Sequence, residues 1–232
     1  MIIDKILIVL GEPFSIFSEI LFKYLKSSKF KKNNKTIIII GNLNFFKKQM
    51  KKLKYNFVFN LIKDPDFATH GKINIINIEF SFSKIFDKIS NKSRNYIYRC
   101  FKYSLNILKK KKNFALVNGP ISKKHFFIKG KYPGVTEFLA RETNSKNEIM
   151  LIYNDNISVS PLTTHIPIKH VSKKIKKEKI YLNVNSINQF YKKKFNKKPK
   201  FAILGLNPHC ESSDKINEEK KEIIPAIKKL KN

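Results

Sequence analysis

The strongest constraint on the fold is that short β-branched runs alternate with longer amphipathic segments through the first half of the chain. The sequence predicts strands at residues 6–10, 36–40, 73–78 and 114–117, and helices at residues 15–26, 44–54 and 90–110. Such alternation is typical of βα units around a largely parallel sheet, so we expect an α/β protein. Residues 56–71 fit neither pattern and are expected to be irregular.

The pattern changes after Gly119, which predicts a domain boundary. We expect one α/β domain at residues 1–118 and a central α/β domain at residues 119–232. The second domain is predicted to contain helices at residues 136–143, 181–195 and from 217 onward, a hairpin of strands at residues 149–153 and 157–160, and a strand at residues 201–204. The last helix reaches Asn232 with no closing strand, so the fold is expected to be incomplete at its C-terminus.

The net charge of +31 suggests nucleic acid or an anionic membrane as a partner, but the type of basic residue argues against nucleic acid. Of the 48 basic residues only Arg94, Arg99 and Arg141 are arginines, the residue that nucleic-acid readers favour for bidentate contacts. The lysines are spread along the whole chain beside abundant Ile, Asn and Phe. We interpret the charge as compositional drift, and keep polyanion binding as an alternative function.

Membrane insertion and secretion are not expected. The apolar runs are far shorter than the roughly 20 residues that span a bilayer, and Asp4 stands where a signal peptide would be basic. The two cysteines, Cys100 and Cys210, lie far apart and form no Cys-x-x-Cys pattern, which argues against a disulfide framework or a cysteine-built zinc site. These features predict a cytoplasmic protein.

Two histidines carry the clearest chemical signal. His165 lies in Thr-Thr-His-Ile-Pro and His209 in Gly-Leu-Asn-Pro-His, each just after an apolar, strand-like run. Imidazoles on loops at the same end of a parallel sheet can share a divalent metal ion. Each histidine alone also fits a structural role, and no third convincing ligand accompanies them; as a pair they favour metal binding. His70, His125 and His170 are interpreted as surface residues.

Two further motifs can bind an anion. Residues 118–123 (Asn-Gly-Pro-Ile-Ser-Lys) follow a predicted strand, where free backbone amides and the charge of Lys123 suit a phosphate. Residues 134–137 (Gly-Val-Thr-Glu) open a predicted helix, with Thr136 placed to cap it. Each motif alone is also explained by an ordinary turn or helix cap.

Taken in order, the motifs resemble one enzyme family. They are residues 11–13 (Gly-Glu-Pro), 118–123, 134–137, 163–167, 205–209, 218–219 (Glu-Glu) and 224–227 (Ile-Pro-Ala-Ile). This set resembles the 4-hydroxythreonine-4-phosphate dehydrogenases of vitamin B6 biosynthesis, across nearly the whole chain. The resemblance implies a two-domain fold like that of isocitrate and isopropylmalate dehydrogenases, with the active site completed at the interface of a homodimer.

The resemblance also implies the reaction and the residues that serve it. Family members oxidise the hydroxyl of 4-phosphooxy-L-threonine with NAD or NADP and a divalent metal ion (zinc, magnesium or cobalt), and the keto acid decarboxylates to 3-amino-2-oxopropyl phosphate. By motif, His165 and His209 would be metal ligands and Thr136 would contact substrate. Lys123 is assigned a catalytic role near the phosphate.

The chain departs from the family at several positions. Val135 stands in the substrate-binding motif where members usually carry histidine, which leaves open a dehydrogenase for a related hydroxy-acid. Phe14 and Ser212–Ser213 replace glycines. The family's third metal histidine and its cofactor-binding loops correspond to positions beyond Asn232, so an inactive or repurposed fragment is the remaining alternative.

Overall fold

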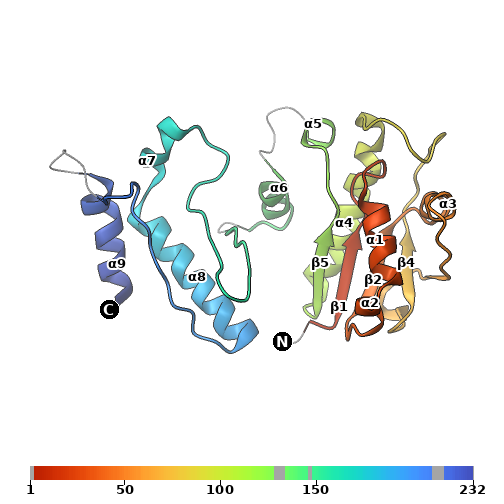
Figure 1. Ribbon diagram of the computed structural model, residues 1–232, viewed down its shortest axis with the longest axis horizontal. Helices are drawn as coiled ribbons and strands as arrows, with labels where there is room; N and C mark the ends of the chain where they lie inside the picture. Colours follow the sequence, from red (N-terminus) through yellow and green to blue (C-terminus); the bar gives the residue numbers. More distant parts are fainter. Residues whose placement is uncertain (1–2, 128–133, 146–147, 211–216, 232) are drawn as a thin grey trace. The chain divides into compact units, whose positions relative to one another are not determined.

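The computed structural model describes residues 3–127, 134–145, 148–210 and 217–231, and the chain forms two compact units, Met1–Asn144 and Ser145–Asn232 (Figure 1). The expected domain boundary after Asn118 falls inside the first unit. Helix α6 (Val135–Glu142) follows that boundary, yet its Phe138 is buried in the core of the first unit. The compact units therefore differ from the predicted domains.

A five-stranded parallel sheet forms the centre of the first unit. Its strands are β1 (Lys5–Val9), β2 (Thr36–Gly41), β3 (Phe59–Leu61), β4 (Ile73–Asn77) and β5 (Phe114–Asn118), in the order β3-β4-β2-β1-β5. Every neighbouring pair is parallel. The predicted α/β class and parallel sheet are confirmed, while the segment expected to be irregular contributes the short edge strand β3.

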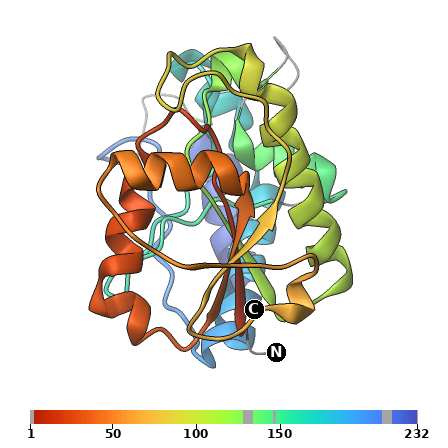
Figure 2. The ribbon, with the colours of Figure 1, turned by 90° about the vertical axis from the view of Figure 1, so that its right-hand side faces the viewer.

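Helices cover both faces of this sheet, as Figure 2 shows. Helices α1 (Phe17–Lys26) and α3 (Leu43–Lys52) pack on one face, and α4 (Arg94–Lys110) packs on the other. Strand β1 contributes side chains to the cores on both faces. Leu7 and Val9 belong to the core under α4, while Ile8 belongs to the core under α1 and α3. This alternation follows from the two-residue period of a strand and explains why Ile6–Val9 of β1 and Ile37–Ile40 of β2 are continuous apolar runs.

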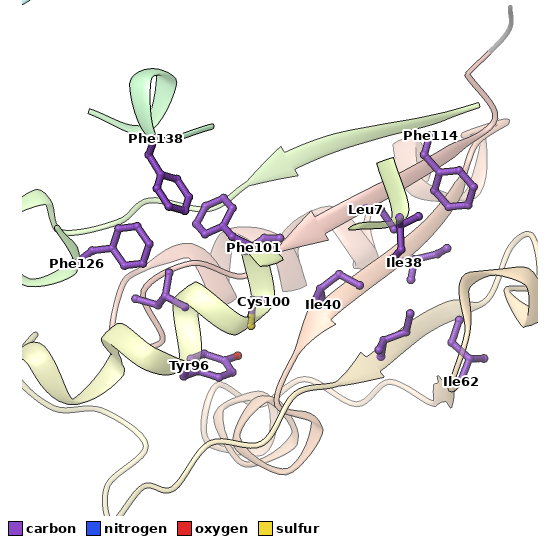
Figure 3. Close-up of a cluster of buried hydrophobic side chains, with 14 of the residues drawn as sticks. Leu7, Ile38, Ile40, Ile62, Tyr96, Cys100, Phe101, Phe114, Phe126 and Phe138 are labelled. Carbon is purple, nitrogen blue, oxygen red and sulfur yellow. The ribbon is translucent and has the colours of Figure 1, made fainter. Parts of the chain in front are cut away.

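Three phenylalanines tie α4 to the segments that follow β5. Phe101 of α4 meets Phe126 of the short helix α5 (Lys123–Phe126) and Phe138 of α6, with ring centroids 5.9 and 5.4 Å away (Figure 3). Phe126 and Phe138 meet edge to face at 5.3 Å, a favoured geometry for aromatic pairs. This cluster fixes α5 and α6 on the first unit, and with them the motifs at residues 118–123 and 134–137.

The second unit is built from helices, and the segments where strands were expected are largely irregular. Its elements are α7 (Val171–Lys174), α8 (Lys177–Phe195), a π-helical turn (Glu219–Ile223) and α9 (Ile224–Lys231). The predicted hairpin is reduced to one antiparallel bridge between Ile152 and Val159, and residues 201–204 form no strand. The prediction of a strand at residues 201–204 was wrong because an apolar run becomes a strand only beside a partner strand, and the described residues offer this run none.

A small apolar core holds the second unit together. It consists of Ile175, Ile180, Ile223 and Ala226, and Ile203 packs against it. No helix among the described residues is both long and apolar enough to cross a bilayer. Ser212–Ser213 lie outside the described residues.

We predict that Phe101→Ala lowers the free energy of unfolding by about 3–5 kcal/mol, because the removed ring is fully buried and touches two other rings. Chemical denaturation with both variants measures this. Phe67→Ala is the control, since Phe67 is 72% exposed and its truncation is expected to change stability little. Equal effects of the two substitutions would contradict the packing described for Phe101.

Candidate functional site

The turn after β1 and the turn after β5 touch through their backbones. Gly11 has φ +72°, and a Cβ atom there would lie 2.5 Å from the carbonyl oxygen of Pro120. The amide of Glu12 donates to that same oxygen at 2.9 Å, and the amide of Gly119 donates to the carbonyl of Val9 at 2.8 Å. Only glycine fits this conformation and this close approach, so residues 11–13 and 118–123 form one structural element at the carboxyl end of the sheet.

Glu12 places a buried carboxylate at this junction. Its oxygens accept hydrogen bonds from Ser93 Oγ at 2.8 Å and from the amide of Phe14 at 3.3 Å, and the side chain is 2% exposed. Burial raises the pKa of Glu12 above its ordinary value of 4.5, and the two hydrogen bonds and the nearby His125 oppose only part of that shift. The carboxylate links the turn after β1 to the start of α4.

The start of α4 also holds the segment that carries Lys123. Arg94 donates from Nε to the carbonyl of His125 at 2.9 Å and from Nη2 to Asn91 Oδ1 at 3.3 Å. Asn91 Oδ1 lies 3.2 Å from His125 Nδ1. His125, expected at the surface, is half-buried in this network, whereas His70 and His170 are exposed as expected.

Lys123 and Glu137 converge over the start of α6. A Cβ atom placed on Gly134 would lie 3.0 Å from Glu137 Oε2 and 3.7 Å from Lys123 Nζ. Gly134 is the N-cap residue and its helix has no side-chain cap, so the expectation that Thr136 caps the helix was wrong. Thr136 lies within the first turn and is exposed, and Val135 packs against the core under α4. The motifs at residues 118–123 and 134–137 thus come together, with Thr136 free of a capping role.

His165 and His209 lie in the second unit, on segments without regular secondary structure. His165 has φ +55°, and both side chains are exposed. The amide of His209 donates to Asn207 Oδ1 at 3.0 Å, and the amide of Cys210 donates to the carbonyl of Asn207 at 3.1 Å, which closes a tight turn around His209. The parallel sheet contains no described strand from this unit, so the expectation that the two histidines follow strands of one sheet was wrong.

Imidazole suits zinc and cobalt, and exposed imidazoles on loops are open to a metal ion, so the donor chemistry of His165 and His209 fits a divalent metal. A zinc site usually takes three or four protein ligands. Among the residues that the structure describes, no group of three or more His, Cys, Asp and Glu side chains is placed to hold a metal ion. Two imidazoles alone would therefore supply only part of such a site.

Two structural carboxylates had no role in the sequence analysis. Glu12 and Glu219 were considered only as members of sequence motifs. Both are buried and accept hydrogen bonds from segments distant in the sequence. A glutamate beside a glycine and a proline, or one of two adjacent glutamates, carries no local signal of burial. Their partners are far away in sequence, which is why pattern reasoning missed them.

Comparison with known proteins identifies the family. A profile of the family described as pyridoxal phosphate biosynthetic protein PdxA matches residues 33–232. A 4-hydroxythreonine-4-phosphate dehydrogenase from Sulfurihydrogenibium sp. (strain YO3AOP1) is 36% identical over 233 residues, which cover 98% of this chain and 70% of that relative. This chain belongs to the PdxA family.

The PdxA family includes more than one named activity. A D-threonate 4-phosphate dehydrogenase from Salmonella typhimurium is 27% identical over 228 residues, covering 95% of this chain and 69% of that protein. The crystal structure of a 4-hydroxythreonine-4-phosphate dehydrogenase from Klebsiella pneumoniae matches with a TM-score of 0.83 at 21% identity, over 98% of this chain and 72% of that one, which shows the shared fold. The protein is a PdxA-family dehydrogenase, an oxidoreductase related to pyridoxal phosphate biosynthesis.

We predict that Glu12→Gln stabilises the protein increasingly as the pH rises. Because the folded-state pKa of Glu12 is raised, the folded chain binds more protons than the unfolded chain above about pH 4.5, and ionisation of Glu12 costs stability as the pH rises through the folded pKa. Thermal unfolding of wild type and variant between about pH 5 and pH 8 measures the difference. Asp87→Asn is the control for an exposed carboxylate. A Glu12→Gln difference that is constant with pH would contradict the assignment.

Proposed function

We propose that this protein oxidises the hydroxyl of 4-phosphooxy-L-threonine with NAD or NADP, after which the β-keto acid decarboxylates to 3-amino-2-oxopropyl phosphate. Oxidation transfers a hydride from the carbinol carbon to the nicotinamide and a proton from the hydroxyl to a base, and decarboxylation releases CO₂. The observation that carries the proposal is the convergence of Lys123 on the start of α6 in a PdxA-family chain.

The start of α6 provides the chemistry for a phosphorylated substrate. The Lys123 ammonium and the N-terminus of α6, whose first amides have no carbonyl partner within the helix, both favour a dianionic phosphate. The exposed Thr136 hydroxyl in the same turn can donate a hydrogen bond to the substrate. The network from Glu12 and Ser93 to Arg94 and the carbonyl of His125 holds the Lys123 segment in place.

A divalent metal ion belongs to the same proposal. His165 and His209 would hold it, with further ligands completing the site. Such an ion supplies a Lewis acid that stabilises negative charge on the oxygen during oxidation and decarboxylation. The role of the chain's own residues is to present two imidazoles on exposed loops.

We also propose that two copies of the chain associate. The segment closed by the bridge between Ile152 and Val159 carries four side chains that are largely exposed: Ile152, Tyr153, Ile157 and Val159. Exposed apolar patches of this kind mark interaction surfaces, and a second copy of the chain is the occupant that agrees with an active site completed across a dimer.

D-threonate 4-phosphate is the second candidate substrate. Val135 replaces the histidine usual in the family, and a relative with that activity is 27% identical. The two substrates differ in whether carbon 2 carries an amine or a hydroxyl, and an apolar Val135 offers neither a donor nor an acceptor to that group. Parallel turnover of both compounds by wild type and Val135→His decides between them.

We predict that His165→Ala and His209→Ala each weaken binding of zinc or cobalt by more than about 100-fold and abolish metal-dependent NAD(P) reduction, because each removes an inner ligand. Titration with cobalt, followed by its visible absorption, measures affinity independently of turnover. His170→Ala is the control, as an exposed histidine of the same unit outside the motifs. Unchanged cobalt affinity in either motif variant would refute the metal assignment.

We predict that Lys123→Met raises KM for 4-phosphooxy-L-threonine by about 10- to 100-fold, the equivalent of one charge-assisted hydrogen bond. The effect is expected to vanish with unphosphorylated 4-hydroxy-L-threonine, which lacks the group that Lys123 would bind. Lys124→Met, at the adjacent exposed lysine, controls for lost charge. If both variants change KM equally, the effect comes from long-range electrostatic attraction, and the specific role of Lys123 is refuted.

A further inference from the structure

Two buried carboxylates lie on the π-helical turn of the second unit, Glu219–Ile223. Glu219 is 5% exposed and Glu222 is 8% exposed. Burying a carboxylate is costly unless it is hydrogen-bonded, and each of these makes contacts with a segment distant in the sequence. π-Helical turns are rare and are frequent at functional sites.

Glu219 binds the loop that carries His209. Its Oε1 accepts a hydrogen bond from the amide of Leu206 at 2.9 Å. Leu206 lies within the motif at residues 205–209, where no ladder or helix pairs the backbone amides. The loop is also folded tightly, because a Cβ atom on Gly205 would lie 2.5 Å from Cys210 Sγ.

The start of the π-helical turn is held by local hydrogen bonds. Asn217 Oδ1 accepts from the amide of Lys220 at 2.9 Å, and the carbonyl of Asn217 accepts from the amide of Lys221 at 2.9 Å, which locks the start of the helical segment. Ile223 and Ala226 anchor the same segment in the core of the unit. Glu219 therefore holds the loop from a fixed position.

Glu222 has a different role on the same turn. Its Oε2 accepts from the amide of Lys177 at 2.9 Å, and its Oε1 accepts from Lys176 Nζ at 3.2 Å. These contacts cap the first turn of α8, whose own N-cap residue provides no side-chain cap. Glu222 is thus a matched control: a buried carboxylate on the same turn that binds α8 rather than the loop with His209.

We propose that Glu219 is a positioning residue for His209, fixing the backbone of residues 205–209 so that the imidazole is presented to a divalent metal ion. The loop-anchoring part stands on this structure alone, and the metal part rests on the proposed function. Ordering a free loop when the metal binds costs conformational entropy, which weakens the affinity. A loop that is already anchored does not pay this cost on binding.

The test compares Glu219→Met, which fills the space without an acceptor, with Glu219→Gln, which keeps the acceptor oxygen. Glu222→Met is the control for lost stability. The rate of amide hydrogen exchange at Leu206, followed by NMR on the full chain without metal, measures whether the loop is anchored. Cobalt titration measures the metal affinity. Glu219→Met is expected to speed exchange and weaken cobalt binding by about 10-fold. Glu219→Gln is expected to stay close to wild type, and Glu222→Met to leave both readings unchanged.

Unchanged Leu206 exchange in Glu219→Met would overturn the proposal, as would equal losses in Glu219→Gln or Glu222→Met. Unchanged cobalt affinity in Glu219→Met beside a clear loss in His209→Ala would also overturn it and leave the metal assignment standing. If exchange responds as expected but His209→Ala binds cobalt like wild type, the anchor is confirmed and the metal part of the proposed function fails.

Discussion

The candidate site in the first unit depends on the backbone contact between Gly11 and Gly119–Pro120. Strands β1 and β5 are neighbours, so their following turns emerge side by side, and the absence of a Cβ on Gly11 lets them meet. That contact fixes the position of Glu12 and the start of the segment that leads to Lys123. A side chain at Gly11 would push the two turns apart and misplace every group that follows them.

Much of the first unit could be predicted from sequence because its signals are local. Ile37 to Ile40 are buried on both faces of a central strand, and a continuous apolar run is what such a position requires. In the second unit the same kind of signal failed. Phe201 and Leu204 lie in an apolar run but are exposed, since a strand also needs a partner and sequence pattern does not show whether one is present.

The residues of the candidate site were also predictable only where a local motif marks them. Sequence motifs pointed to Lys123, Thr136, His165 and His209. The groups that hold such segments in place, however, come from positions far away in the sequence. Ser93 binds Glu12 across 81 positions, and Glu219 binds Leu206 across 13. No periodicity connects these residues, so only the folded chain reveals which glutamates are structural.

Charge distribution explains why the large excess of lysine says little about function. The buried polar residues of the described chain are Asn, Gln, Ser and Glu, with no lysine or arginine among them. A lysine ammonium can remain in water at the end of its flexible stem, so many lysines can accumulate on the surface at little cost to stability. A buried carboxylate is costly unless the folded chain gives it hydrogen-bond partners. With only 17 acidic residues in the chain, the buried Glu12 and Glu219 are therefore more informative about the site than the 48 basic residues.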